Sequence, residues 1–488
     1  MSPGVNAQKK SAAGASRGGD YFNQRQPMEP TQMNYSSAAF LSPDQHQALW
    51  EILDFAASTR PTHALSGPAG TGKTYLMRHV LAQVARNVRL SATTNKAAAV
   101  CGQLAPGSDA RTIHNLLGLQ PEADYRKGRM VLKRKRDPKV KPGDLVVIDE
   151  SSMIDGDLLR LIREYAARIG FQVLFVGDAG QLPPIFEPAS PAFSAVPTSR
   201  LTTVHRQALD NPILAAATDF RRVLDGEAFP TLQGQDRGLV AADGRQFTEW
   251  MLDTFDSDAY EGDGDFCRAL AWSNKRVIEL NRVIRRRLIG PEADRWPILP
   301  GESCIVNDAL LEDEDLVFPT ESLVAVHSVK PAALCDKETG INVAGHWVEV
   351  SNNSNTGEAF VPTDREAARG LLSAYASKAR ALQRECEGWK KARQPAPDDL
   401  DERRRAAWRE FFKVKGQLAD LRPPHASTVH KSQGSTIEHV FIDVADIGRC
   451  TRADLIARLM YVALTRPRQT AIITGELPAR LYPLQEAA

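Results

Sequence analysis

A glycine-rich loop contains the first residues whose types and spacing suggest chemistry. The segment Gly67-Pro-Ala-Gly-Thr-Gly-Lys-Thr74 follows an apolar run and precedes a helical pattern. Glycines in such a loop let successive backbone N–H groups turn toward phosphate oxygens at a helix N-terminus. In this spacing Lys73 is expected to reach the β- and γ-phosphates and the Thr74 hydroxyl to ligate Mg²⁺. The remaining contacts of this predicted nucleotide site are Gly67, Gly70, Thr71 and Gly72.

An acidic pair ends a second apolar run. Asp149 and Glu150 follow Leu145-Val-Val-Ile148. One carboxylate at the tip of a strand can hold a metal ion, while its neighbour orients and deprotonates the attacking water. From their order we assign Asp149 to Mg²⁺ and Glu150 to the general base. Together with the phosphate-binding loop, this pair predicts hydrolysis of a nucleoside triphosphate.

Alternating strands and helices position these residues. Between residues 39 and 198, short apolar runs of buried parallel-strand type alternate with helical stretches, which is typical of a doubly wound α/β domain. A second set of such runs lies at Phe266–Trp272, Glu438–Val444 and Thr470–Gly475. It predicts a second α/β domain formed by residues 199–298 and 422–488.

The segment that interrupts the second domain has a different character. Residues 299–365 read as short antiparallel strands with polar turns, which predicts a small barrel. Residues 366–421 carry two amphipathic patterns, which predict a helical hairpin packed on itself. We assign the aromatic residues of this segment to its core: Trp347, Trp389, Trp408, Phe411 and Phe412. Residues 1–38, rich in Ser, Gly, Ala and Gln, are expected to form a disordered tail.

The composition excludes several classes of protein. The 488 residues carry 61 Lys+Arg and 60 Asp+Glu, a net charge of +1, which excludes a uniformly basic coat but not a local basic groove. No apolar run approaches the roughly 18 residues that cross a bilayer, and no signal-peptide pattern begins the chain. Six cysteines without short paired spacing indicate reduced thiols rather than a disulfide framework or a zinc cluster. We therefore expect a cytoplasmic protein without a membrane partner.

One stretch concentrates positive charge. Residues 126–141 contain nine basic residues and one acidic residue, Asp137, so their net charge is +8 and that of the remaining chain is −7. Such a stretch suits contact with a phosphate backbone, and a solvated loop is the alternative. The triplets 285–287 and 403–405, all arginine, leave the same two interpretations open.

Seven further segments have the form and order of helicase motifs. They are Leu41–Ala48, Ser91–Ala98, Thr112–His114, Gly177–Pro184, Leu201–Gln207, Thr428–Ser435 and Tyr461–Arg468. They resemble the motifs of superfamily-one helicases, and more narrowly of the phage Dda and bacterial RecD-like branch. The resemblance implies two RecA-like doubly wound parallel-sheet domains. It places a β-hairpin insertion in the first (119–142) and an SH3-like barrel with a helical hairpin in the second.

The resemblance also implies roles on the nucleotide side, with ATP as the nucleotide. Gln45 would read the adenine edge, Gln181 would sense the γ-phosphate, and Gly434 would contact the nucleotide from the motif that couples it to DNA. Arg206 and Arg466 would come from the second domain and neutralise the charge of the transition state when the domains close.

On the DNA side the resemblance and the basic stretch together supply the predicted contacts. They are Thr93, Asn95, Lys96, Thr112, His114, Lys133, Arg134, Lys135, Arg136, Thr428, His430 and Lys431. In Dda-like relatives the basic stretch occupies the place of a hairpin that splits the duplex. Here Tyr125, Met130, Val131 and Leu132 are the candidates for stacking on a base pair, and the sequence does not choose among them.

The predicted function is an ATP-dependent DNA helicase that acts on single strands and on junctions of single and double strands. The sensor motif reads QLPP and the coupling motif HKSQG, forms that resemble the 5′→3′ branch. We expect a functional monomer in a bacterial or phage-infected cell. A single-strand-binding protein or a replication or repair protein is a further expected partner.

Two alternatives remain beside this prediction, and a third is rejected. One is a translocase that strips proteins from DNA without unwinding it, and another is a RecD-like or Pif-type motor subunit of a larger complex. The sequence shows no cluster of carboxylates of the kind that nucleases use, so we do not expect the chain to cut DNA itself. The third, a small-molecule kinase with the same phosphate loop, leaves Arg206, Arg466 and the HKSQG motif without a role.

Overall fold

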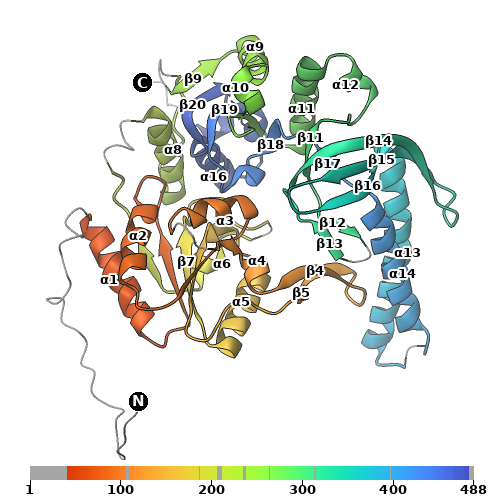
Figure 1. Cartoon of the computed structure of the whole chain (residues 1–488), viewed down its shortest axis with the longest axis horizontal. Helices are drawn as coiled ribbons and strands as arrows, with labels where there is room; N and C mark the ends of the chain where they lie inside the picture. Colours follow the sequence, from red (N-terminus) through yellow and green to blue (C-terminus); the bar gives the residue numbers. More distant parts are fainter. Residues whose placement is uncertain are drawn as a thin grey trace, which may run out of the picture. The chain divides into compact units, whose positions relative to one another are not determined.

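The structure of the chain is a computed structural model, shown in Figure 1. The residues that it describes are 41–105, 109–185, 187–205, 211–234, 238–262, 264–312, 315–395 and 397–482. The predicted tail 1–38 and Arg206 lie outside the described residues. No helix among the residues described is both long and apolar enough to span a membrane.

The first sheet has six parallel strands in the order β3-β2-β6-β7-β1-β8. They are β1 (Thr62–Ser66), β2 (Val88–Ala92), β3 (Arg111–Thr112), β6 (Leu145–Asp149), β7 (Gln172–Gly177) and β8 (Thr198–Arg200). The helices between them are α1 (Pro43–Ala57), α2 (Lys73–Gln83), α3 (Asn95–Gly102), α4 (Ile113–Leu116), α5 (Gly156–Ile169) and α6 (Pro191–Ser194), with the 3₁₀ turn η2 (Ser151–Met153). Because β1, β6 and β7 are neighbours, the loops that follow them meet at one edge of the sheet.

A two-stranded antiparallel hairpin extends from the first sheet between α4 and β6 (Figure 1). We call it the basic hairpin; it consists of β4 (Leu119–Asp124) and β5 (Arg129–Arg134). Its base is anchored because the side chain of Leu119 is buried in the core of the first sheet, with Leu132 packed against that core.

The second sheet has five parallel strands in the order β18-β10-β19-β20-β9. They are β9 (Leu239–Ala242), β10 (Cys267–Ala271), β18 (Ala426–Thr428), β19 (Ile437–Asp443) and β20 (Pro467–Thr474). The helices are α8 (Pro212–Arg222), α9 (Gly244–Phe255), α10 (Asp258–Gly262), α11 (Asn274–Ile289), α12 (Glu292–Arg295), α15 (Val444–Gly448) and α16 (Ala453–Leu464), with the 3₁₀ turns η3 (Val223–Asp225), η4 (His430–Ser432) and η5 (Ala479–Leu481). The sequence prediction of two parallel-sheet α/β units is confirmed.

A five-stranded antiparallel sheet forms the insertion, in the order β16-β15-β14-β11-β17. Its strands are β11 (Ser303–Val306), β14 (Leu323–Cys335), β15 (Asn342–Ser351), β16 (Thr356–Pro362) and β17 (Leu421–Arg422), beside a small pair β12 (Leu310–Glu312) and β13 (Asp315–Phe318). Ala419, just before β17, donates its N–H to the carbonyl of Phe360 in β16 at 2.8 Å, which brings the two edges together. Strand β17 therefore completes the barrel from beyond the predicted limits 299–365.

Two long helices, α13 (Arg365–Ala392) and α14 (Leu400–Gln417), stand beside the barrel in Figure 1, and we call them the tower. The predicted apolar stripe is buried at Leu371, Tyr375, Ala379 and Cys386. Of the five aromatic residues predicted as core, Trp408 is buried, and Trp389, Phe411 and Phe412 are half-buried. Trp347 is 36% exposed, because it lies on the outward face of β15 and meets Phe360 only edge-on.

Candidate functional site

The phosphate loop, Gly67–Thr74, joins β1 to α2 at the edge where β6 and β7 also end. Gly72 occupies the N-cap of α2 at φ 75°, and no side chain caps this helix. The first N–H groups of α2 therefore remain available to an anion, which the helix dipole also favours. A Cβ on Gly67 would lie 2.7 Å from Thr71 Oγ1, so this position requires glycine.

Two side chains hold the loop in shape. Lys73 Nζ donates to the carbonyls of Gly67 at 2.6 Å and Pro68 at 3.0 Å, which places the ammonium inside the curl of the loop. Gln45, fully buried at the start of α1, donates from Nε2 to the carbonyl of Thr71 at 2.9 Å. Its Nε2 also lies 2.9 Å from His205 Nε2. The residue predicted to read the base thus lies against the phosphate loop.

The acidic pair lies at the tip of β6. Asp149 accepts a hydrogen bond from the N–H of Glu150 at 2.9 Å, and Glu150 takes a left-handed backbone conformation at φ 51°. Burial raises the pKa of both carboxyl groups, and the nearby Lys73 ammonium opposes that rise. Within the described residues, Glu150 Oε2 is buried without a hydrogen-bond partner. A buried carboxylate oxygen without a partner is unfavourable unless a ligand completes the site.

The second sheet brings groups to the same place. The guanidinium of Arg466, only 6% exposed, donates to the carbonyls of Val462 and Ser435, both at 3.1 Å. Its charge opposes the rise in the pKa of Glu150, so the two side chains lie within electrostatic reach of each other. A Cβ on Gly434 (φ 71°) would lie 3.7 Å from Glu150 Cγ. The predicted catalytic residues Glu150 and Arg466 are thus brought together.

The loop after β7 is part of the same contact. Gln181, the predicted sensor, is 7% exposed and accepts a long 3.5 Å contact from Gln433 Nε2. The Arg458 guanidinium of α16 donates to the carbonyls of Ala179 at 2.9 Å and Gln181 at 2.8 Å. Arg458 was not among the predicted residues, although it is the one charged residue in the apolar stretch Leu455–Leu464, which was the available signal.

A cleft of about 1390 Å³ runs between the two sheets and the barrel. Eight predicted DNA contacts line it: Thr93, Asn95, Lys96, Thr112, His114, Arg136, His430 and Lys431. The other four do not: Thr428 is buried beneath the cleft, whereas Lys133, Arg134 and Lys135 lie exposed on or next to β5. The structure therefore gathers contacts from both sheets along one surface.

Carboxylates accompany the two lysines of this cleft. Lys96 Nζ lies 2.6 Å from Asp265 Oδ1, across the boundary between the sheets. Lys431 Nζ lies 2.6 Å from Glu321 Oε1 of the barrel and donates to Asn307 Oδ1 at 2.5 Å. These partners were not predicted, because the position of Asp265 depends on how the two sheets pack and those of Glu321 and Asn307 on how the barrel packs on the second sheet.

The charge of the basic hairpin is partly compensated. Glu122 on β4 forms ion pairs with Lys133 and with Lys135, the latter at 2.6 Å. Sequence analysis counted only Asp137 against the basic residues, because Glu122 lies outside the stretch 126–141 and reaches it only through the pairing of β4 with β5.

The tip of the basic hairpin packs on the tower. The Tyr125 ring lies 6.2 Å from that of Phe412, and the Arg409 guanidinium lies over Tyr125 at 5.4 Å. Of the four predicted stacking candidates, Tyr125 is thus packed against the tower, whereas Leu132 lines the cleft.

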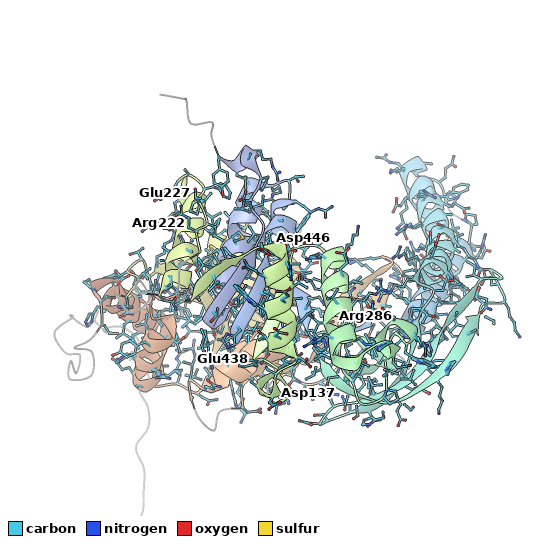
Figure 2. The ribbon with its side chains drawn as sticks, turned by 90° about the horizontal axis from the view of Figure 1, so that it is seen from above. Asp137, Arg222, Glu227, Arg286, Glu438 and Asp446 are labelled. Carbon is cyan, nitrogen blue, oxygen red and sulfur yellow. The ribbon has the colours of Figure 1, made fainter. Side chains whose placement is uncertain are left out.

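The two arginine triplets have acidic partners. Arg285 is 5% exposed and pairs with Glu302, and Arg286, labelled in Figure 2, pairs with Asp294 on the neighbouring helix α12. The remaining pairs are Arg287 with Asp253 and Asp256, Arg403 with Asp399, and Arg404 and Arg405 with Asp401. These pairs favour the structural interpretation of both triplets over DNA contact.

Known proteins resemble this chain over most of its length. A model of the AAA domain matches residues 40–241, and a model of the UvrD-like helicase C-terminal domain matches residues 424–474. The ATP-dependent DNA helicase dda of Enterobacteria phage T4 is 25% identical over 449 residues, 83% of this chain and 92% of that protein. The RecBCD enzyme subunit RecD of Mycobacterium tuberculosis is 26% identical over 441 residues, 84% of this chain and 66% of that protein. The ATP-dependent RecD2 DNA helicase of Deinococcus radiodurans is 39% identical over 182 residues, 36% of this chain and 23% of that protein.

Proposed function

This chain belongs to the superfamily-one DNA helicases of the Dda/RecD-like branch, and from that premise we propose that it is an ATP-dependent DNA helicase. It hydrolyses ATP between two RecA-like domains, moves 5′→3′ along single-stranded DNA and unwinds duplex. The proposed domains are 39–198 for the first and 199–298 with 422–488 for the second. The barrel (299–365, completed by β17) and the tower (366–421) are inserted into the second.

The observation that carries the proposal is that the second sheet brings Arg466 and Gly434 to the acidic pair, beside a cleft lined from both sheets. Arg466 donates to the carbonyl of Ser435, and the Cβ position of the adjacent Gly434 lies 3.7 Å from Glu150 Cγ. Glu150 takes the proton of the attacking water, and Lys73 holds the phosphates. Arg466 neutralises charge that develops in the transition state. Because Arg466 comes from the second sheet, the rate of hydrolysis depends on how the two sheets are apposed. This dependence couples ATP hydrolysis to movement of one domain relative to the other. Arg206 is proposed as a second such arginine.

The residues at the nucleotide site fit Mg²⁺. Asp149 and the exposed hydroxyl of Thr74 would hold the ion, and the raised pKa of Asp149 reflects a buried carboxyl group that a cation would stabilise as its anion. Over the described ranges, no group of three or more His, Cys, Asp or Glu residues could hold a metal. Mg²⁺ characteristically takes one or two protein oxygens together with phosphate and water. When bound, the ion supplies charge neutralisation at the β- and γ-phosphates.

The cleft is the proposed path of the single strand. Lys96 and Lys431 bind phosphates from the first and second sheets respectively, and His114 and His430 flank the same path. Burial lowers the pKa of both imidazoles, so they act as neutral hydrogen-bonding groups rather than as cations. The motif forms at Gln181–Pro184 and His430–Gly434 resemble those of the 5′→3′ branch and support that direction.

The basic hairpin is the proposed element of strand separation. Its contact with the tower supports this role, because a hairpin braced at its tip can resist the load of an advancing duplex. Leu132 is the stacking candidate to test first, since it lines the cleft.

Cellular context is proposed from the relatives alone. Their phage and bacterial origins support action in the cytoplasm of a bacterial or phage-infected cell, in DNA replication, repair or recombination. We propose a functional monomer that works with a single-strand-binding protein or a repair partner. Membership of a larger complex, as the name of RecD indicates for that protein, is the competing arrangement.

Unwinding of two duplexes, one with a 5′ and one with a 3′ single-stranded overhang, tests the proposal. We expect ATP-driven unwinding from the 5′ overhang only, and none with Glu150→Gln or Lys73→Ala. Unwinding from the 3′ overhang only would reverse the direction. If neither duplex opens while single-stranded DNA still stimulates ATP hydrolysis, the protein is a translocase and the role of the hairpin is wrong.

A further inference from the structure

One buried hydroxyl group joins the phosphate loop to the loop after β7. Tyr461, on α16 of the second sheet, is 1% exposed. Its hydroxyl oxygen accepts a hydrogen bond from the N–H of Ala69 at 2.8 Å and donates one to Asp178 Oδ2. Ala69 lies in the phosphate loop, and Asp178 belongs to the segment that carries the sensor Gln181. A single side chain from the second sheet therefore contacts two loops of the first.

Asp178 is a fully buried carboxylate and depends on such partners. It is 0% exposed, its Oδ1 accepts the N–H of Gly180 at 2.8 Å, and Arg221 Nε lies 3.7 Å from the same oxygen. Burial and the adjacent carboxylate raise the pKa of Tyr461 well above its usual value, so the hydroxyl stays protonated and acts as the donor to Asp178. A buried charge that loses a hydrogen-bond partner is strongly destabilised, and its surroundings rearrange to restore one.

Arg458 on α16 and Arg466 just beyond its end also act across this boundary. Arg458, three residues before Tyr461, donates to the carbonyls of Ala179 and Gln181. Arg466, just beyond the end of α16, donates to the carbonyl of Ser435, and the Cβ position of the adjacent Gly434 lies 3.7 Å from Glu150 Cγ. Tyr461 lies between them, and of these three described residues it is the one whose hydrogen bond reaches the phosphate loop. The orientation of α16, and with it that of Arg466, is thus linked to the loop that would hold the phosphates.

We propose that Tyr461 is a positioning residue for ATP hydrolysis, which ties the phosphate loop at Ala69 to Asp178 so that α16 sets Arg466 against Glu150. The inference rests on the proposed ATPase activity and deepens it. Arg466 and Gln181 act on the transition state, whereas Lys73 and the loop N–H groups bind the ground state. Loss of the hydroxyl should therefore lower kcat and leave the affinity for ATP nearly unchanged.

Tyr461→Phe tests this, because it removes the hydroxyl and keeps the ring. Tyr375→Phe is the matched control: Tyr375 is 5% exposed and donates to Asp336 Oδ1 at 2.8 Å, the same bond in the barrel and tower. The measurements are kcat and KM for ATP with saturating single-stranded DNA, the Kd of a fluorescent ATP analogue with Mg²⁺, and the Tm. For Tyr461→Phe we expect kcat about tenfold lower or more, with KM and Kd within about threefold of the wild type. For Tyr375→Phe we expect a lower Tm and an unchanged kcat.

Several outcomes would overturn the inference. One is a kcat of Tyr461→Phe within twofold of the wild type. Another is a rise in KM and Kd of Tyr461→Phe without a fall in its kcat. The third is a fall of kcat in Tyr375→Phe equal to that in Tyr461→Phe. If Tyr461→Phe does not fold, Asp178→Asn decides: lower kcat with unchanged KM supports the inference, and unchanged kcat overturns it. Wild-type protein without ATPase activity would overturn the proposed function and this inference together, whereas wild-type activity in Tyr461→Phe overturns the inference alone.

Discussion

The ring of Trp408, on the second helix of the tower, lies directly against Gly128 at the tip of the basic hairpin. A Cβ built on Gly128 would lie 2.3 Å from Trp408 Cε2, so the two elements pack without room for a side chain. Gly128 also has a φ of 64°, which favours glycine for a separate reason. Glycine at position 128 is thus favoured both by the contact with the tower and by the backbone conformation of the turn.

Substitution Gly128→Ala should separate the hairpin from the tower and reduce unwinding more than ATP hydrolysis stimulated by single-stranded DNA. We expect unwinding to fall about tenfold, since a displacement of about 1 Å in a working group can cost up to about 10²-fold. Gly143→Ala is the control, because Gly143 has a φ of 81° but nothing within 4 Å of its Cβ position. Equal losses in both variants would attribute the effect to backbone strain alone.

The ion pair between Glu321 and Lys431 should compete with DNA for the lysine. Glu321→Gln is expected to strengthen binding of single-stranded DNA about two- to fivefold, which corresponds to the ~0.5–1 kcal/mol of a partly exposed ion pair. Fluorescence anisotropy with a labelled oligonucleotide measures the change. Glu338→Gln, which breaks the pair with Lys378 beside the tower, is the control. Unchanged or weaker binding in Glu321→Gln would mean that the carboxylate positions Lys431 for DNA.

Arg136 and Lys133 should differ in their contribution to DNA binding. Arg136 lines the cleft, whereas Lys133 forms an ion pair with Glu122 and lies outside it. Arg136→Ala is expected to reduce the slope of log K against log salt concentration by about 0.7, the value for one phosphate contact on a single strand. Lys133→Ala should change this slope less. Salt titrations of oligonucleotide binding measure both slopes, and the opposite ranking would contradict the path proposed for the strand.

Acidification should destabilise the protein through His425. Burial, with Arg268 and Arg285 nearby, lowers the pKa of this histidine to about 3 from the usual 6.5. Between these values the unfolded chain binds the proton and the native one does not. His425 therefore does not reduce the free energy of unfolding above pH 6.5. Below that value the free energy of unfolding falls as the pH decreases, by at most about 1.4 kcal/mol per pH unit.

Urea unfolding at pH 7 and pH 5 measures this contribution. We expect His425→Gln to show a smaller difference in free energy of unfolding between the two pH values than the wild type. Tyr260→Phe removes the 2.7 Å contact with His425 Nδ1 but keeps the imidazole, so it should retain the wild-type difference. The same difference in His425→Gln as in the wild type would assign the acid sensitivity to other groups.

Local patterns predicted the framework because each of its elements is specified by its own residues. The strands that end at Ser66, Asp149 and Gly177 are apolar runs long enough to be buried whole, and the phosphate loop needs glycine at Gly67 and Gly72 for reasons confined to the loop. The tower followed likewise from its apolar stripe.

The partners of buried polar groups were not predictable in this way. Glu122 meets Lys133 through a hairpin register, and Glu321 meets Lys431 only once the barrel is packed on the second sheet. Trp347 was predicted as core together with the other aromatic residues of the insertion, but the packing of the strand places it on the outer face. Register and packing decide these contacts, and neither is encoded in a short segment.

The amino-acid sequence alone predicted the chemistry of this protein, through a phosphate loop, a carboxylate pair and a series of short motifs resembling those of a DNA helicase. Only the tertiary structure decided which of these groups act on one another. Tyr461 and Asp178 are 283 residues apart, and their hydrogen bond exists because α16 of the second sheet packs against the loops that follow β1 and β7, where a buried carboxylate must find a donor. Residues close in sequence are enough to predict a phosphate loop or a strand that ends in carboxylates. The contacts between distant buried groups depend on how the elements pack.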